Sequence, residues 1–104
     1  MLVEQRTYEL QPGTLHQFLH AYETEGLALQ SAALGNLLGY FTTEAGELNC
    51  VVHLWGFDSY EDRQRRRSEL SANPAWRAFL QKAGSAVKAQ RNQLLNPTSF
   101  SPIR

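Results

Sequence analysis

The chain has 104 residues, ten basic and ten acidic, so its formal net charge at neutral pH is zero. A chain of this length forms one domain around one core, and without net charge it has no overall field that attracts nucleic acid or an anionic membrane. Its single cysteine, Cys50, excludes an intrachain disulfide, and no apolar run approaches the roughly 18 residues of a membrane span, so we expect one cytoplasmic domain over residues 1–104.

The first predicted elements are a strand and a helix. Residues 2–10 alternate between the two faces of a strand, and one face carries Leu2, Glu4, Arg6, Tyr8 and Leu10. A Pro-Gly pair ends this strand. Thr14, with Gln17 three residues later, matches the capping-box pattern, so a helix is predicted to begin there and to continue on apolar spacing to about Leu34.

Two strands are predicted next, over residues 36–44 and 47–57, and a tight turn at Ala45 and Gly46 is expected to join them as an antiparallel hairpin. The second of these strands is apolar on both faces. One face holds Leu48, Cys50, Val52 and Leu54, and the other holds Val51, His53, Trp55 and Phe57. Neither face is suited to contact with water.

The last predicted elements are two helices and a strand. Asp58, with Glu61 as its capping partner, predicts the start of a helix that ends at Asn73. Asn73 is followed by a proline, which predicts the start of a second helix that Gly84 ends, and residues 87–95 form a final strand. The order β-α-β-β-α-β predicts an α+β, ferredoxin-like fold with a four-stranded antiparallel sheet.

The two faces of this sheet need two different covers. Two helical segments cover only one face, so the apolar second face requires another partner. A second copy of the same sheet is the simplest cover, because most soluble oligomers use one self-complementary surface. We therefore expect a homodimer in which the sheets pack face to face.

Three segments of the chain resemble the NIPSNAP family: EQRTYELQPG at residues 4–13, NCVVHLWGFDSYEDR at residues 49–63, and RSELSANPAW at residues 67–76. The resemblance implies a dimeric α+β barrel and kinship with a superfamily that contains cofactor-independent monooxygenases and haem-degrading enzymes. It implies no particular reaction. Animal members carry mitochondrial targeting segments, and since this chain starts directly on its first strand, we expect a cytoplasmic, bacterial-type member.

The helix at residues 58–70 is rich in arginine. Its four arginines are matched by four acids, which does not favour nucleic-acid binding. Arg63 and Arg67 nevertheless lack an acid three or four residues away, and they share a stripe with Leu70, so their guanidinium groups are expected to point toward the sheet. There they would hold a small anion, such as a carboxylate or phosphate, or pair with a protein acid such as Glu4 or Glu9, or extend into solvent.

A cavity beside the sheet is predicted from side chains on the strands. His53 lies in mid-strand beside Trp55 on a mostly apolar face, where burial favours a neutral imidazole that accepts a proton. Arg6, Tyr8, Tyr40 and Trp55 are candidates to line the same cavity, with Tyr8 or His53 handling a proton. The alternative is that His53 is structural and that the aromatic residues only pack the core.

The sequence contains no strong metal or cofactor motif. His16, His20 and Glu23 share one side of the first helix, but this spacing is common on polar helix faces and is a weak signal. There is no nucleophile elbow, phosphate-binding glycine loop or zinc-type cysteine array, so we expect no metal and no cofactor.

Two functions remain open from the sequence. In the first, one pocket between sheet and helices binds or transforms a small aromatic or anionic molecule, with Arg63 and Arg67 at its anionic end and His53 or Tyr8 handling a proton. In the second, the protein is a non-catalytic dimeric interaction module. A ligand that raises the melting temperature would favour the first function.

Overall fold

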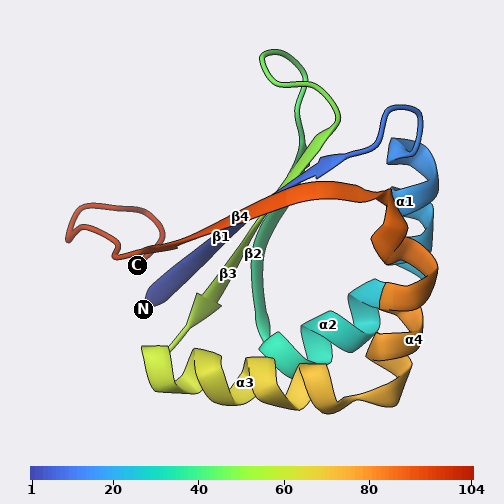
Figure 1. The fold of residues 1–104 in the computed structure, drawn as a ribbon. Helices are drawn as coiled ribbons and strands as arrows, with labels where there is room; N and C mark the ends of the chain where they lie inside the picture. The colour runs from blue at the N-terminus through green and yellow to red at the C-terminus, as the bar shows by residue number, and fades with distance from the viewer.

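The computed structural model of the protein describes residues 1–104 and has the predicted order of elements (Figure 1). The four antiparallel strands form one sheet in the order β2-β3-β1-β4, so the α+β, ferredoxin-like fold is confirmed. The strands are β1 (Leu2–Leu10), β2 (Asn36–Thr42), β3 (Cys50–Phe57) and β4 (Val87–Leu95). The helices are α1 (Leu15–Ala21), α2 (Leu27–Leu34), α3 (Tyr60–Ala72) and α4 (Pro74–Ala83).

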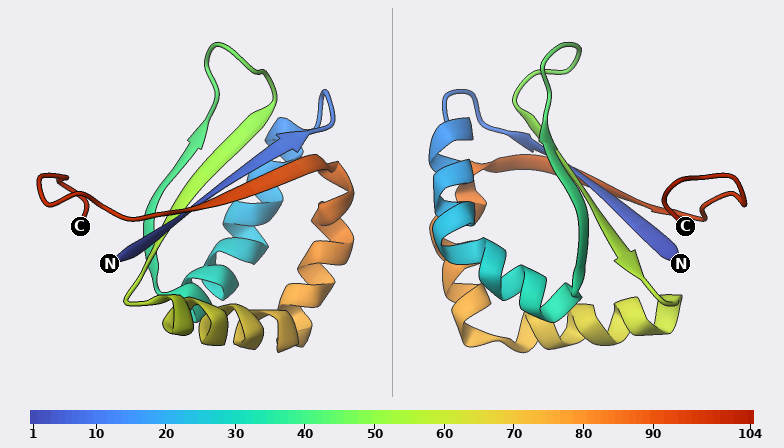
Figure 2. Two further views of the ribbon diagram at one scale, coloured as in Figure 1. Left: turned by 60° about the vertical axis from the view of Figure 1, so that its left-hand side comes forward. Right: turned by 180° about the vertical axis from the view of Figure 1, so that it is seen from behind.

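All four helices lie on the same side of the sheet, with α3 along one end and α1, α2 and α4 further along (Figures 1 and 2). The predicted alternation of β1 is confirmed, because the face that carries Glu4 and Tyr8 is turned toward the helices. The register of the sheet places Arg6 and Tyr40 on either side of His53. The core between sheet and helices includes Leu10, Phe18, Val51, Trp55, Leu70, Trp76 and Phe79.

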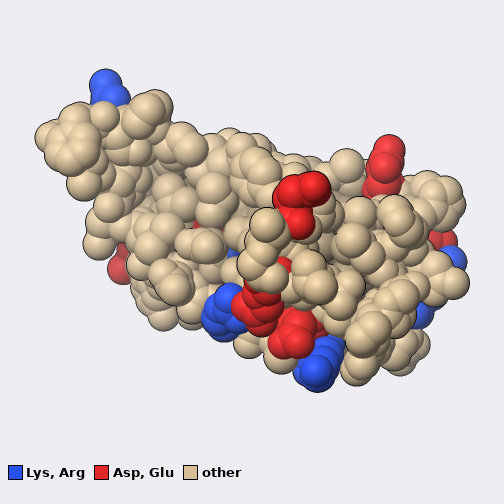
Figure 3. Space-filling view, turned by 90° about the horizontal axis from the view of Figure 1, so that it is seen from above, with Lys and Arg blue, Asp and Glu red and all other residues tan.

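The surface carries both signs of charge. Acidic and basic side chains are interspersed on the side seen in Figure 3, and neither sign forms a large continuous area. None of the helices combines the length and the apolar character that crossing a membrane requires.

The connection between β2 and β3 differs from the prediction. Residues 43–49 form a loop, closed by a hydrogen bond from the Thr43 amide to the Cys50 carbonyl at 3.1 Å. Gly46 and Asn49 have positive φ angles of 89° and 61°, which bend the chain twice before β3 begins. The antiparallel pairing was predicted correctly, but the tight turn at Ala45 and Gly46 was wrong.

Two of the predicted helix caps differ in detail. Thr14 is the N-cap residue of α1 as predicted, but its hydroxyl donates to the carbonyl of Gln11 at 2.6 Å and makes no capping bond to the helix amides. The cap of α3 is Ser59, whose extended backbone lets its hydroxyl accept from the Asp62 amide at 3.0 Å. The Asp62 carboxylate in turn accepts from the amide of Asp58, the residue before the cap, at 3.2 Å, so the cap lies one residue after the predicted position.

The first helix is interrupted by a π-helical turn at Tyr22–Gly26, between α1 and α2. The Thr24 hydroxyl donates to the carbonyl of His20 at 2.8 Å and satisfies one of the backbone acceptors near this turn. Gly26 allows α4 to approach closely, because a Cβ atom at this position would lie 2.8 Å from the ring of Phe79. A turn of this kind changes which side chains share a face of the helix.

Candidate functional site

A buried ion cluster joins β1 to α3. Glu4 is 0% exposed, and its carboxylate accepts hydrogen bonds from three arginines. Arg63 Nη2 lies 2.6 Å and Arg6 Nη1 lies 3.1 Å from Glu4 Oε2. Arg67 Nη2 and Nε lie 2.9 and 3.2 Å from Glu4 Oε1. We call Glu4, Arg6, Arg63 and Arg67 the Glu4 cluster.

The arginines of the Glu4 cluster keep its carboxylate ionised. Burial acts to raise the pKa of Glu4, but the hydrogen bond from Arg63 and the charges of Arg67 and Arg6 outweigh burial and lower this pKa. The pairing with Glu4 is one of the alternatives that the sequence left open. Arg63 and Arg67 are partners of a protein acid, and this corrects the ligand-binding role predicted for them, because the Glu4 carboxylate occupies the space between them.

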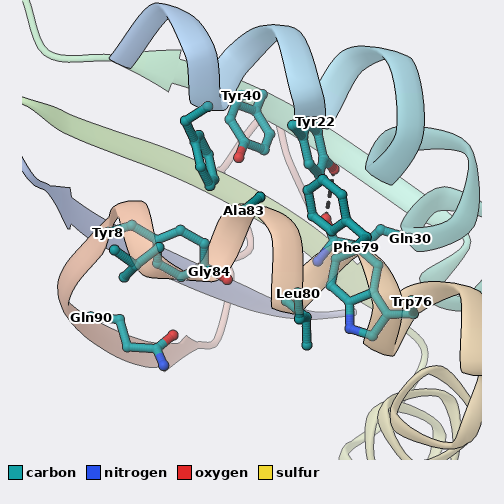
Figure 4. Close-up of a pocket in the computed structure, with 12 residues that line it drawn as sticks. Tyr8, Tyr22, Gln30, Tyr40, Trp76, Phe79, Leu80, Ala83, Gly84 and Gln90 are labelled. Atoms are coloured by element: carbon teal, nitrogen blue, oxygen red, sulfur yellow. Dashed lines mark hydrogen bonds between the residues drawn. The ribbon is translucent and has the colours of Figure 1, made fainter. Parts of the chain in front are cut away.

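A cavity of about 150 Å³ lies between the sheet, the helical segment of residues 15–34 and α4 (Figure 4). Six aromatic rings form most of its wall, and two glutamine amides and several small residues complete it. The rings belong to Tyr8, Phe18, Tyr22, Tyr40, Trp76 and Phe79, and the other lining residues include Gln30, Gln90, Ala83 and Gly84. An aromatic wall with a few polar groups is typical of small-molecule sites.

The π-helical turn brings two polar groups of this cavity together. The Tyr22 hydroxyl donates to Gln30 Oε1 at 2.6 Å, and Gln30 is only 1% exposed. Eight residues of regular α-helix would leave these side chains about 80° apart, since each residue turns the helix by about 100°. The π-helical turn winds less per residue and removes most of that offset.

The hydroxyls of Tyr22 and Tyr40 remain protonated at neutral pH. Burial raises the pKa of Tyr22, and the neighbouring Tyr8 adds to the effect. Burial also raises the pKa of Tyr40, which stacks on the ring of Tyr22 with centroids 4.8 Å apart. These hydroxyls therefore act as hydrogen-bond donors inside the cavity.

His53 lies in the layer beneath the cavity wall. Tyr40 stacks on its ring with centroids 4.6 Å apart, and Tyr8 meets it edge-on at 4.9 Å. Trp55 Nε1 donates to His53 Nδ1 at 2.7 Å, so the imidazole hydrogen is on Nε2. Burial, with the charges of Arg6 and Arg67, lowers the pKa of His53 to about 3. The imidazole is therefore neutral as expected, but this geometry does not support the predicted proton-accepting role.

The predicted site residues fall into two groups. Tyr8 and Tyr40 line the cavity, and Arg6 is one contact away, because its Nε donates to the Tyr8 hydroxyl at 3.2 Å. His53, Trp55, Arg63 and Arg67 do not line it. A single pocket shared by Arg63, Arg67 and His53 is therefore not formed. Glu4 and Tyr8 are four residues apart on β1, which is roughly 13 Å along the strand. For this reason α3 covers Glu4, while the cavity begins at Tyr8.

Two polar residues of the cavity, Gln30 and Gln90, were not predicted from the sequence. Gln30 is a polar side chain in the apolar run LALQSAAL, and that contrast is a usable signal for a buried polar contact. Gln90 lies on β4, whose polar sequence gives no such contrast. Tyr22 was assigned only to the core, although its hydroxyl makes the polar pair with Gln30.

Solved structures with the same architecture cover the whole chain. A protein from Agrobacterium tumefaciens is 40% identical, with a TM-score of 0.98 and complete coverage of both chains. A NIPSNAP-like domain protein from Burkholderia xenovorans is 45% identical, covers 97% of this chain and 88% of its own, and has a TM-score of 0.94. A putative antibiotic biosynthesis monooxygenase from Nitrosomonas europaea is 8% identical with a TM-score of 0.67, so it shares the fold alone.

Curated relatives agree with this result. A NipSnap homolog from Dictyostelium discoideum is 34% identical over 97 residues, which are 93% of this chain and 43% of that protein. Human NipSnap homolog 3A is 32% identical over 101 residues, which are 97% of this chain and 41% of that protein. The chain thus spans less than half the length of these two relatives. The NIPSNAP family model matches residues 3–102, and the chain therefore belongs to the NIPSNAP family.

Proposed function

We propose that the protein binds a small molecule with a single aromatic ring in the cavity between sheet and helices. The observation that carries this proposal is a cavity of about 150 Å³ walled by six aromatic rings. A cavity of about this volume is large enough to bind benzene. The Tyr22 and Gln30 pair and the Tyr40 hydroxyl would orient polar substituents of the ring.

The chemistry of the wall favours binding over proton transfer. The ionisable side chains that line the cavity are tyrosines, and the raised pKa values of Tyr22 and Tyr40 keep their hydroxyls protonated. His53 uses its Nδ1 lone pair to accept from Trp55, and its pKa of about 3 makes it a weak base. A transformation in this cavity would therefore depend on the reactivity of the ligand itself.

Filling the cavity is expected to abolish ligand binding. Ala83 on α4 lines the cavity, so Ala83→Leu places additional carbon atoms near the space that the ring would occupy. We expect its affinity for a single-ring probe such as phenol to fall at least tenfold, which corresponds to about 1.4 kcal/mol. Ligand-observed NMR with the purified protein measures this change.

Ala78→Leu is the matched control for this test. Ala78 lies on the same helix, is exposed, and does not line the cavity. Its affinity for phenol is expected to equal that of the unmodified protein. Equal binding by both variants, or no binding by the unmodified protein to a panel of single-ring compounds, would rule out the cavity as the site.

We further propose that a second copy of the chain covers the open face of the sheet. No helix lies on this face (Figure 2). On β3, one of the two central strands, Val52 and Leu54 are partly exposed. Phe41 and Leu95, on the two edge strands, are 55% and 37% exposed. Apolar side chains on an open sheet favour a self-complementary contact. A non-catalytic role of this assembly is the second candidate function.

A charge on the open face is expected to prevent this assembly. Val52→Arg would place a guanidinium in the proposed apolar contact, where taking its charge out of water is costly. Light scattering should then report a monomer, while Ala72→Arg, at the exposed end of α3, should remain a dimer. A monomeric unmodified protein at micromolar concentration would contradict the dimer.

We also infer that the protein resides in the cytoplasm. Cys50 is a free, buried thiol. Free thiols persist in compartments where glutathione and thioredoxin maintain reducing conditions. Fractionation of cells that express the natural protein, with a cytoplasmic marker enzyme alongside, checks this location.

A further inference from the structure

We propose that the ligand is an aromatic acid, and that Arg6 and Tyr8 bind its carboxylate at the edge of the cavity. This inference rests on the proposed function, since it specifies the chemical class of the molecule that the cavity binds. Two observations support it. The first is a pair of hydrogen-bond donors at one side of the cavity, Arg6 Nη2 and the Tyr8 hydroxyl, and the second is the excess of positive charge behind them.

The charged side chain of Arg6 is hydrogen-bonded to two residues of the cavity wall. Its Nε donates to the Tyr8 hydroxyl at 3.2 Å and its Nη2 donates to Gln90 Oε1 at 3.3 Å, and both of these partners line the cavity. The bond to Gln90 is the longest that Arg6 makes, and Gln90 is exposed. A ligand carboxylate can therefore replace the Gln90 oxygen on Nη2 at little cost, because a charged acceptor makes the stronger bond.

Tyr8 supplies a second donor at the same place. Its hydroxyl oxygen accepts from Arg6, and a hydroxyl that accepts in this way still has its own hydrogen to donate. Figure 4 shows Tyr8 and Gln90 on one side of the cavity, away from Phe79 and Trp76 on the other. An aromatic ring packed against Phe79 and Trp76 would thus direct a substituent toward Tyr8 and Arg6.

The Glu4 cluster provides the charge that an acid would complement. Three guanidinium groups share one carboxylate, which leaves an excess of two positive charges. Glu4 is the shared acid in the salt bridges of Arg6, Arg63 and Arg67. All three arginine side chains are between 12% and 19% exposed, so solvent screens this excess only in part. An anion at Arg6 would reduce the excess to one.

The same arrangement disfavours other ligand classes. A cationic aromatic molecule would be repelled by the Arg6 guanidinium, which contacts Tyr8 and Gln90 at the edge of the cavity. A neutral molecule would leave the charge of Arg6 without a new partner. The planar guanidinium of Arg6 and the single hydroxyl of Tyr8 match the two oxygens of one carboxylate.

Benzoate and benzamide separate this inference from the proposed function, because they have nearly the same shape and differ in charge. Calorimetry at low ionic strength is expected to show benzoate binding at least tenfold more tightly than benzamide. This preference should shrink as salt is added. Tyr8→Phe should weaken benzoate binding on the order of tenfold and affect benzamide less. Arg6→Gln should remove the preference for the acid.

Lys88→Gln is the matched control for Arg6→Gln, because it removes the same charge from an exposed side chain that pairs with Glu9. It should leave the preference for benzoate unchanged. Equal affinity for benzoate and benzamide would overturn the acid and leave the cavity proposal standing. Binding of neither probe would overturn both. If Arg6→Gln lowers the melting temperature strongly, an unchanged benzoate affinity in Tyr8→Phe still refutes the inference.

Discussion

Replacing Glu4 with glutamine is expected to lower the free energy of unfolding by about 3 kcal/mol, the largest effect of any single exchange proposed here. The Glu4 carboxylate is 0% exposed and accepts from Arg6, Arg63 and Arg67. Glutamine preserves the shape but leaves three largely buried guanidinium groups without a counter-charge. For a domain of this size the melting temperature should fall on the order of 10 to 20 °C, which thermal unfolding by circular dichroism measures.

Glu9→Gln is the control for this exchange. Glu9 lies on the same strand, its side chain is 31% exposed, and its carboxylate is 3.5 Å from Lys88 Nζ. Pairs of this kind contribute at most about 1 kcal/mol, so this variant should unfold close to the unmodified protein. If the two variants melted at the same temperature, the Glu4 cluster would not be a main source of stability.

Acidification is expected to destabilise the protein through His53. Burial and the charges of Arg6 and Arg67 hold the pKa of His53 at about 3 in the folded state, below the ordinary value of 6.5. Between these values the unfolded chain binds a proton that the folded chain does not, so the stability due to the neutral imidazole falls as pH falls from 6.5 toward 3. The full loss is on the order of 4 kcal/mol, and urea unfolding at a series of pH values measures it.

His53→Gln isolates this contribution. The glutamine oxygen can accept from Trp55 Nε1 and does not titrate, so the variant should lose less stability between pH 6.5 and 4 than the unmodified protein. His20→Gln changes an exposed histidine and should leave the pH profile as it is. Identical slopes in His53→Gln and the unmodified protein would contradict the buried, neutral state of His53.

Glu4 acts in a lower pH range than His53. Its pKa in the folded state is below the ordinary value of 4.5, since the arginines outweigh the effect of burial. The contribution of the Glu4 cluster is therefore complete above pH 4.5 and is lost as pH falls through the lower folded pKa. Glu4→Gln should be less sensitive to acid in that range.

Much of the fold was predictable because it follows from local patterns. The alternation of β1 places Glu4, Arg6 and Tyr8 on one face of the strand, and in the structure this face is turned toward the helices. The spacing of Arg63 and Arg67 predicted that both side chains point toward the sheet, and both contact Glu4. In each case the periodicity of one element is sufficient, with no knowledge of its neighbours.

The remainder depends on contacts between elements. The sequence predicts one pocket for Arg63 and His53. In the structure Arg63 belongs to the Glu4 cluster, which lies at a different position along β1 from the cavity. Residues 43–49 form a wider loop than the predicted two-residue turn, with positive φ angles at Gly46 and Asn49. The cap at Ser59 was missed since Asp58 is an equally good capping residue by type.

The arrangement of polar groups in the cavity depends on the number of residues in the π-helical turn at Tyr22–Gly26. Deleting one residue from this turn would let the helix close with regular α-helical bonds, and the half that follows would rotate by about 100°. Gln30 would then leave Tyr22. A relative shorter by one residue here would present different polar groups to the cavity even if every side chain of the cavity were retained.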